Sequence, residues 1–166
     1  IAVSPSVKAF LREGYQVPEE KIRVVLNGIA WTPPAPAALE IAVQQFRRHC
    51  GLSNGAGGPI IGMIARLSAV KGASVLLEAF HRLRQTVPAA RLLIVGDGPS
   101  RPELIKQAYA LGEQEHVVLT GTVDITAVPL RIMDLFVLPS LNEAFGLSIV
   151  EAMAMELPVV ASRVGG

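Results

Sequence analysis

Ile60-Ile61-Gly62-Met63-Ile64-Ala65 is an uninterrupted apolar stretch directly after Pro59. A strand of a parallel sheet that is covered on both faces has this composition, because neither face meets water. The segment that follows, residues 73–85, carries apolar side chains at helical spacing along one face. The two segments together predict a strand followed by a helix, which is the repeating unit of a parallel sheet.

The alternation of short apolar runs and longer amphipathic segments continues along the chain. Further strands are predicted at residues 91–95, 116–120, 134–138 and 158–161, and further helices at residues 101–111, 126–133 and 147–155. Crossovers between neighbouring parallel strands are right-handed, which places the helices on both sides of the sheet. The predicted fold class is therefore α/β, a Rossmann-like, doubly wound parallel sheet with helices on both faces.

The first fifty residues follow a less regular pattern. Ser4-Pro5 is a typical helix start, and Gly14 is a plausible end of that helix. Residues 22–26 have the composition of a strand and residues 38–50 that of a helix. These segments predict three more elements before the alternating pattern begins.

Two irregular stretches separate these elements. Residues 32–36 are too rich in proline for either regular element, and we expect the adjacent Trp31 to cover the core in preference to lining a hinge. Residues 51–58 are rich in glycine, as are loops that cradle a phosphate, but such a loop follows a strand whereas this one precedes it. A flexible connector is the favoured interpretation of residues 51–58.

The composition excludes several classes of protein. With 166 residues, 51% of them hydrophobic, the chain can bury a core of its own, and we expect one domain over residues 1–166. A net charge of +1 argues against a nucleic-acid-binding protein, and no apolar run is long enough to span a bilayer. Cys50 is the single cysteine, which excludes an internal disulfide and favours a reducing compartment. It keeps no ligand spacing with the histidines, so no metal site is predicted.

Two basic residues follow the strand predicted at residues 60–65. Arg66 and Lys71 stand just before the helix predicted at residues 73–85. Ligands of an open parallel sheet bind beyond the carboxyl ends of its strands, and two cations beside a helix N-terminus attract an anion. The alternative is a solvated loop with two ordinary surface charges, and the spacing alone favours that alternative.

Two glycines follow the next strand, in Gly96-Asp97-Gly98-Pro99. They could let the backbone approach a phosphate closely. The dinucleotide-binding fingerprint requires a third glycine, but Arg101 stands at that position, and no acidic residue ends the following strand. Classical NAD binding is therefore disfavoured, and a tight turn between strand and helix is at least as good an interpretation.

Two carboxylates follow the strand predicted at residues 134–138. Glu143 falls in the loop and Glu151 in the helix predicted to begin near Gly146. Both can face the carboxyl edge of the sheet, with the backbone N–H groups of residues 146–148 between them. Carboxylates accept hydrogen bonds from hydroxyl groups, whereas N–H groups donate to phosphate. The alternative is that the two acids only complement the positive end of the helix, but Glu151 lies in a nearly uncharged helix where an unpartnered carboxylate is costly.

These motifs, in this order, resemble those of the retaining GT-B glycosyltransferases of family 4, also called group 1. The most specific match is Pro-Ser-x-x-Glu-x-Phe-Gly-Leu-x-x-x-Glu-Ala-Met-Ala over residues 139–154. Further matches are the donor-phosphate motif (residues 61–72), its following loop (95–99), the strand and turn beside the nucleotide base (118–121) and the entry into the second domain (3–4 and 24–29). The resemblance thus covers nearly the whole chain.

The resemblance implies a role for each matching residue. Arg66 and Lys71 would hold the donor diphosphate and stabilise its charge as the glycosidic bond breaks, so that no metal or other cofactor is required. Glu143 would contact the transferred sugar. The implied catalytic residues are Glu143, Arg66 and Lys71, and the implied substrate-binding residues are Glu151, which would bind the ribose hydroxyls, Phe145, Gly146, Leu147, Ser148, Gly96, Gly98 and Gly121. The reaction would be transfer of a hexosyl group from a nucleoside-diphosphate sugar, with retention at the anomeric carbon.

The resemblance covers the donor-binding half of such an enzyme. The chain starts without Met and stops at the turn-like Val164-Gly165-Gly166, so we expect a piece of a longer protein. A missing N-terminal domain would bind the acceptor, a glycan or a lipid-linked molecule, and the piece alone would bind nucleotide weakly without turnover. The whole protein would be cytoplasmic or peripheral at the inner face of the membrane.

Two other functions stay open from the sequence. The first is a nucleotide-binding module of an oxidoreductase. The second is a non-catalytic module that binds sugar nucleotides, because a fold does not determine a function.

Overall fold

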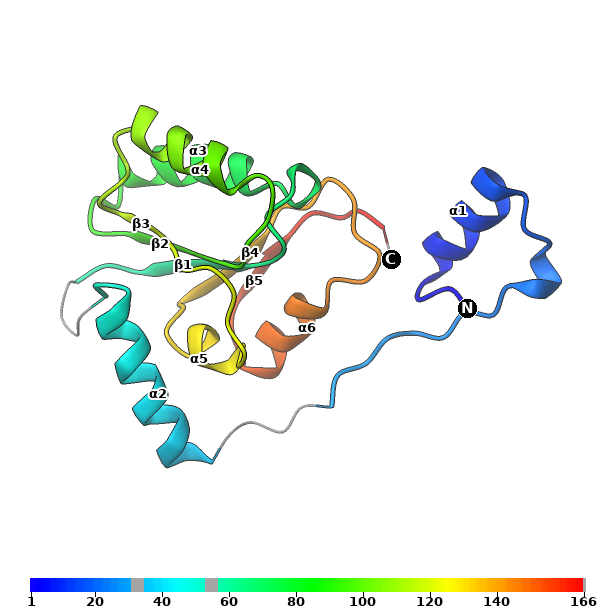
Figure 1. The fold of residues 1–166 in the computed structure, drawn as a ribbon, viewed down its shortest axis with the longest axis horizontal. Coiled ribbons are helices and arrows are strands. Elements are labelled where there is room, and N and C mark those ends of the chain that lie inside the picture. The colour runs from blue at the N-terminus through cyan, green and yellow to red at the C-terminus, as the bar shows by residue number, and fades with distance from the viewer. Residues whose placement is uncertain (31–34, 53–56, 166) are drawn as a thin grey trace.

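Strand β1 (Ile60–Ile64) occupies the centre of the sheet in the computed structural model, which describes residues 1–30, 35–52 and 57–165. The other strands are β2 (Arg91–Val95), β3 (Val117–Leu119), β4 (Leu135–Leu138) and β5 (Val159–Ala161). All pairs are parallel, and the strand order is β3-β2-β1-β4-β5 (Figure 1). The order reverses between β1 and β4, which is where ligands of open α/β sheets bind.

Helices cover both faces of this sheet (Figure 1). Helices α3 (Ala73–Arg84) and α4 (Arg101–Ala110) lie on one face. Helices α2 (Pro36–His49), α5 (Ala127–Leu130) and α6 (Leu147–Ala154) lie on the other. The predicted doubly wound α/β fold is therefore confirmed.

The core forms between the sheet and these helices. All five residues of β1 are buried, as the uninterrupted apolar stretch predicts for a central strand. Gly62 makes room for Met133 in this strand, because a Cβ there would overlap the Met133 side chain unless that side chain moved. Helix α3 turns Leu76, Leu77 and Phe80 to the core, at the spacing expected of one helix face.

Residues 1–26 lie apart from the sheet (Figure 1). Ser4 caps helix α1 (Pro5–Tyr15), as predicted, by accepting a hydrogen bond of 3.2 Å from the Val7 N–H. The helix does not stop at Gly14. It continues to Tyr15, after which Gln16 adopts the left-handed conformation and the Val17 N–H donates to the Leu11 carbonyl.

The strand predicted at residues 22–26 is wrong. Val24 makes a single parallel bridge to Ala2, and a short 3-10 turn, η1 (Glu19–Lys21), precedes it. The bridge does not extend because the partner segment turns into α1 from Ser4 onward. A strand needs a neighbour of matching length, which the sequence pattern of one segment does not reveal.

The helix predicted at residues 126–133 is shorter than expected. Its regular part is α5, and the following N–H groups of Ile132 and Met133 bond to carbonyls three residues back. The Asp134 N–H already donates to the Ile60 carbonyl in the sheet, at 2.8 Å, so the chain must leave the helix before that point.

The predictions for Trp31 and for the centre of the 51–58 connector fall outside the described residues. Among the residues that are described, no helix combines the length and apolar composition needed to cross a membrane.

Candidate functional site

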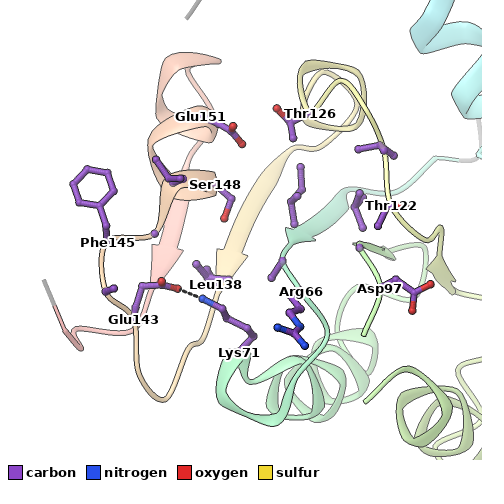
Figure 2. A pocket seen from close by; sticks show the side chains of 18 of the residues that line it. Arg66, Lys71, Asp97, Thr122, Thr126, Leu138, Glu143, Phe145, Ser148 and Glu151 are labelled. Carbon is purple, nitrogen blue, oxygen red and sulfur yellow. Dashed lines mark hydrogen bonds and ion pairs between the residues drawn. The ribbon is translucent and has the colours of Figure 1, made fainter. Parts of the chain in front are cut away.

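A cavity of about 760 Å³ opens at the carboxyl edge of the sheet. The ends of three strands line it through Ile64, Val95 and Leu138. The loops that follow these strands, the segment between β3 and α5, and the start of α6 supply the remaining walls (Figure 2). The cavity therefore lies where the reversal of strand order between β1 and β4 leaves a crevice.

The four charged residues singled out in the sequence all line this cavity. Arg66 and Lys71 come from the loop after β1, Glu143 from the loop after β4, and Glu151 from α6. Figure 2 shows the two basic side chains on one side of the cavity and Glu151 on the opposite side. The expected convergence of two acids and two bases on one crevice is confirmed.

Lys71 and Glu143 form an ion pair inside the cavity. Lys71 is the last residue of the 3-10 turn η2 (Ala69–Lys71), and its Nζ lies 2.6 Å from Oε2 of Glu143. The side chains are 23% and 13% exposed, so water screens the pair only in part. Arg66 is exposed at the cavity mouth and makes no side-chain hydrogen bond to a described residue. Its guanidinium is available to a ligand.

Glu143 is ionised in this setting. Burial alone would raise the pKa of its carboxyl group, but the hydrogen bond and charge of Lys71 outweigh burial, together with hydrogen bonds from Ser140 and the Ala144 backbone. The pKa of Glu143 therefore lies below its usual value. The site holds a carboxylate that can accept hydrogen bonds from sugar hydroxyls.

Glu151 has the opposite electrostatic character. Burial raises the pKa of its carboxyl group, and a hydrogen bond from the Thr126 side chain offsets this rise only in part. In Figure 2 the Thr126 and Glu151 side chains point toward one another across the top of the cavity. Thr126 therefore lies beside the carboxyl group that faces the ligand space.

The first turn of α6 adds backbone donors to the cavity. Gly146 precedes the helix with φ +79° and supplies no side-chain cap, and Leu147 and Ser148 line the cavity beside it. The amides of a first helical turn have no partner within the helix, and the helix dipole makes this end attractive to anions. Phe145 also lines the cavity, with its ring turned away from Arg66 and Lys71 in Figure 2.

The other three glycines predicted to bind substrate, Gly96, Gly98 and Gly121, have different surroundings. Gly96 lines the cavity. Gly98 packs against the backbone of Leu67, which a Cβ would overlap, so this glycine fits the tight-turn interpretation. Gly121 accepts a hydrogen bond of 2.8 Å from the Gly96 N–H through its carbonyl, outside the lining of the cavity.

Sequence reasoning missed several residues that line the cavity. Thr122, Val123 and Thr126 follow β3, and Asn27 comes from the segment before α2. Their position beyond the carboxyl end of β3 was a usable signal for the first three. Asn27 lies outside the alternating pattern, and its signal was the resemblance of residues 24–29 to the segment where the family's chain enters the second domain.

Within the described ranges, no group of three or more His, Cys, Asp and Glu side chains is placed to hold a metal ion. The charged and backbone groups singled out above fall into two kinds, those that suit an anion and those that suit hydroxyl groups. Arg66, Lys71 and the α6 amides suit an anion, whereas Glu143 and Glu151 suit hydroxyl groups. A ligand that carries both chemical groups matches this arrangement.

Comparison with known proteins gives consistent matches. Residues 52–166 match the family model described as glycosyl transferases group 1. An uncharacterised glycosyltransferase of Methanocaldococcus jannaschii is 34% identical over 169 residues, which cover 100% of this chain and 42% of the relative. A GDP-mannose-dependent α-(1-6)-phosphatidylinositol monomannoside mannosyltransferase of Mycolicibacterium smegmatis is 36% identical over 131 residues. These cover 74% of this chain and 34% of the relative.

A solved structure matches the fold as well. HepE of Anabaena, crystallised with UDP-glucose, superposes with a TM-score of 0.80 at 29% identity, over 99% of this chain and 44% of that one. The chain therefore spans less than half the length of these relatives.

Proposed function

Because this chain belongs to the family of group 1 glycosyl transferases, we propose that it binds the nucleoside-diphosphate-sugar donor of a retaining hexosyltransferase. The observation that carries the proposal is the convergence of Arg66, Lys71, Glu143 and Glu151 on one cavity. A nucleoside-diphosphate sugar combines a dianionic linker with two sets of hydroxyl groups. The cavity offers charged and polar partners for each part.

The basic side of the cavity fits the diphosphate. Arg66 and Lys71 lie on the loop after β1, and Leu147 and Ser148 in the first turn of α6 line the same cavity. Charge-assisted hydrogen bonds of this type are about twice as strong as neutral ones. As the bond to the sugar breaks, negative charge grows on the departing diphosphate, and fixed cations stabilise it without requiring a metal.

The two carboxylates fit the two sugars of the donor. Glu143 lies beside Lys71, so it would meet the hexose that is attached to the second phosphate. Glu151 lies across the cavity with Thr126, so it would accept hydrogen bonds from the ribose hydroxyls. Gly96, Phe145 and Gly146 also line the cavity, while Gly98 and Gly121 support the loops that carry this lining.

The related proteins support a hexose donor. HepE was crystallised with UDP-glucose, and the mycobacterial relative is named for its dependence on GDP-mannose. Both donors are nucleoside diphosphates that carry a hexose. Retention at the anomeric carbon follows from the resemblance of residues 139–154 to the retaining family.

We propose that the acceptor binds to a part of the protein outside this chain. This chain spans only 42% of its relative from M. jannaschii. We propose a glycan or a lipid-linked acceptor, because the name of the mycobacterial relative specifies a phosphatidylinositol mannoside. A lipid-linked acceptor would bring the whole protein from the cytoplasm to the inner face of a membrane. The chain alone would bind the donor without transferring the sugar.

Titration calorimetry tests this proposal directly. The chain should bind UDP or GDP, together with the matching UDP-glucose or GDP-mannose, and should bind uridine, guanosine and NAD much more weakly. Tight binding of NAD with no response to the nucleoside diphosphates would instead favour an oxidoreductase module. Sugar transfer by this chain alone would contradict the assignment of the acceptor to another part of the protein.

A further inference from the structure

Ser140 is a buried polar residue at the edge of the cavity. It follows β4 by two positions, is 2% exposed, and its Oγ donates a hydrogen bond of 3.2 Å to Oε2 of Glu143. A buried hydroxyl group is costly unless it finds a partner, and the partner here is an ionised side chain. The hydrogen bond therefore restrains the orientation of the Glu143 carboxylate.

Both side-chain donors engage the same oxygen of Glu143. Lys71 Nζ lies 2.6 Å from Oε2, the atom that also accepts from Ser140. Oε1 accepts from neither of them. We propose that Ser140 is a positioning residue that holds Oε2 of Glu143, together with Lys71 until the donor binds, and leaves Oε1 for a hydroxyl group of the donor hexose. This inference rests on the proposed function.

Ser140 and Lys71 are held in place by a joint between two loops. The Leu141 N–H donates to the Val70 carbonyl at 2.7 Å, which ties the loop after β4 to the loop after β1. Gly72 packs against the Pro139 carbonyl so closely that a Cβ would overlap it. Because Lys71 adjoins Val70 and Ser140 adjoins Leu141, the joint places both donors beside Glu143. The joint is made of backbone groups, so removing the Ser140 hydroxyl leaves it intact.

The two donors differ once a diphosphate is bound. The Lys71 ammonium is charged and has three N–H donors on a flexible stem, so the phosphates draw it away from Glu143. The Ser140 hydroxyl is neutral and buried, and it has one donor hydrogen. Ser140 therefore holds the orientation of Glu143 while Lys71 turns to the diphosphate.

Affinities for UDP and UDP-glucose test this role, since Glu143 would touch the glucose and not the UDP part. Ser140→Ala should lower the affinity for UDP-glucose about fivefold, as expected for one lost hydrogen bond, and leave that for UDP within about twofold. Ser140→Thr keeps the hydroxyl and should restore the wild-type ratio. A small cavity of about 60 Å³ beside Ser140 has room for the added methyl group.

Ser162→Ala is the matched control. Ser162 lines the same small cavity, and its hydroxyl makes no hydrogen bond to a described residue. This variant should bind both probes as the wild type does. A carbon NMR titration of the Glu143 carboxyl should show a raised pKa in Ser140→Ala and the wild-type pKa in Ser140→Thr and Ser162→Ala.

Three results would overturn the inference. Unchanged affinities in Ser140→Ala, with normal wild-type binding, would show that the hydroxyl does not position Glu143. Equal losses for UDP and UDP-glucose would indicate a damaged fold rather than a lost orientation. Failure of the wild type to bind either probe would contradict the proposed function itself, and the role toward the sugar would fall with it.

Discussion

Lys71 Nζ and Glu143 Oε2 lie 2.6 Å apart although 72 positions separate them in the sequence. The pair joins the loop after β1 to the loop after β4, across the point where the strand order reverses. Each residue offsets the charge of the other, so neither is a partly buried charge without a partner. A donor with a diphosphate and a hexose would supply new partners for both residues at once.

Glu143→Gln should change the affinities for UDP and UDP-glucose in opposite directions. Without the carboxylate, the Lys71 ammonium is free to contact a phosphate, so the affinity for UDP should rise about threefold, as expected from a weakened competing pair. The affinity for UDP-glucose relative to UDP should fall, because the hexose loses an ionic acceptor. Calorimetric titrations with both probes give the two values, and parallel losses would contradict this account of the pair.

Arg66→Ala and Lys71→Ala should weaken UDP binding. Hydrogen bonds to charged groups contribute about 1.5 to 3 kcal/mol each, which corresponds to a loss of about tenfold to a hundredfold. Uridine has no phosphate, so its affinity should be unchanged in both variants. Arg82→Ala removes an exposed arginine from α3, outside the cavity lining, and should leave UDP binding as it is. Equal losses for UDP and uridine would point to a damaged fold.

The sequence predicted the sheet and the charged residues of the site because both follow from short patterns. An apolar run such as residues 60–64 specifies a buried strand, and parallel strands bring their carboxyl ends, with Arg66 and Glu143, to one edge. Contacts between loops carry no such pattern. The hydrogen bond from Ser140 to Glu143 and the position of Thr126 opposite Glu151 depend on side-chain rotamers and on how the loops pack.

The misassigned strand at residues 22–26 has a related cause. Its composition suits a strand, but a strand also needs a partner, and here Ala2 is followed almost at once by α1. Similarly, Gly14 can end a helix, yet the left-handed residue that ends α1 is Gln16. In both cases the local sequence allows more than one conformation, and contacts with the surrounding chain determine which one forms.

Donor binding should depend on pH through Glu151. Burial raises the pKa of this carboxyl group above its usual value, and only the ionised form accepts both ribose hydrogen bonds. The affinity for UDP should therefore fall as the pH falls through that raised pKa. The ratio of affinities for UDP and 2′-deoxy-UDP isolates the effect, because protonation of the phosphates weakens both ligands alike. A ratio of affinities that is constant with pH would show that Glu151 does not contact the ribose.

Gly72→Ala should destabilise the fold. Gly72 has φ +71°, and a Cβ there would overlap the Pro139 carbonyl at the joint between the two loops. The unfavourable conformation and the overlap together should cost about 3 kcal/mol of unfolding free energy. Gly28→Ala is the matched control, since a Cβ at Gly28 meets nothing within 4 Å. Chemical denaturation of both variants measures the difference, and equal stability would mean that the joint can shift at little cost.

Glu113 should make the stability of the chain sensitive to acid, away from the site. Its carboxyl group is 3% exposed and contacts Arg84, His81 at 2.8 Å and, more distantly, His116. Burial alone would raise its pKa, but the hydrogen bonds and charges of Arg84 and His81 outweigh burial and hold it below the usual value of 4.5. The stabilisation is therefore complete above pH 4.5 and is lost as the pH falls through the lowered pKa.

Glu113→Gln should remove this dependence on pH. The amide cannot offset the charge of Arg84, so the free energy of unfolding at neutral pH should fall by about 3 kcal/mol, the usual cost of breaking a buried ion pair. The free energy of unfolding of this variant should then change less than that of the wild type as the pH is lowered. Glu103→Gln, at an exposed position in α4, should follow the wild-type curve. Denaturation curves over a series of pH values distinguish the variants, and parallel curves for Glu113→Gln and the wild type would show that other carboxylates cause the acid sensitivity.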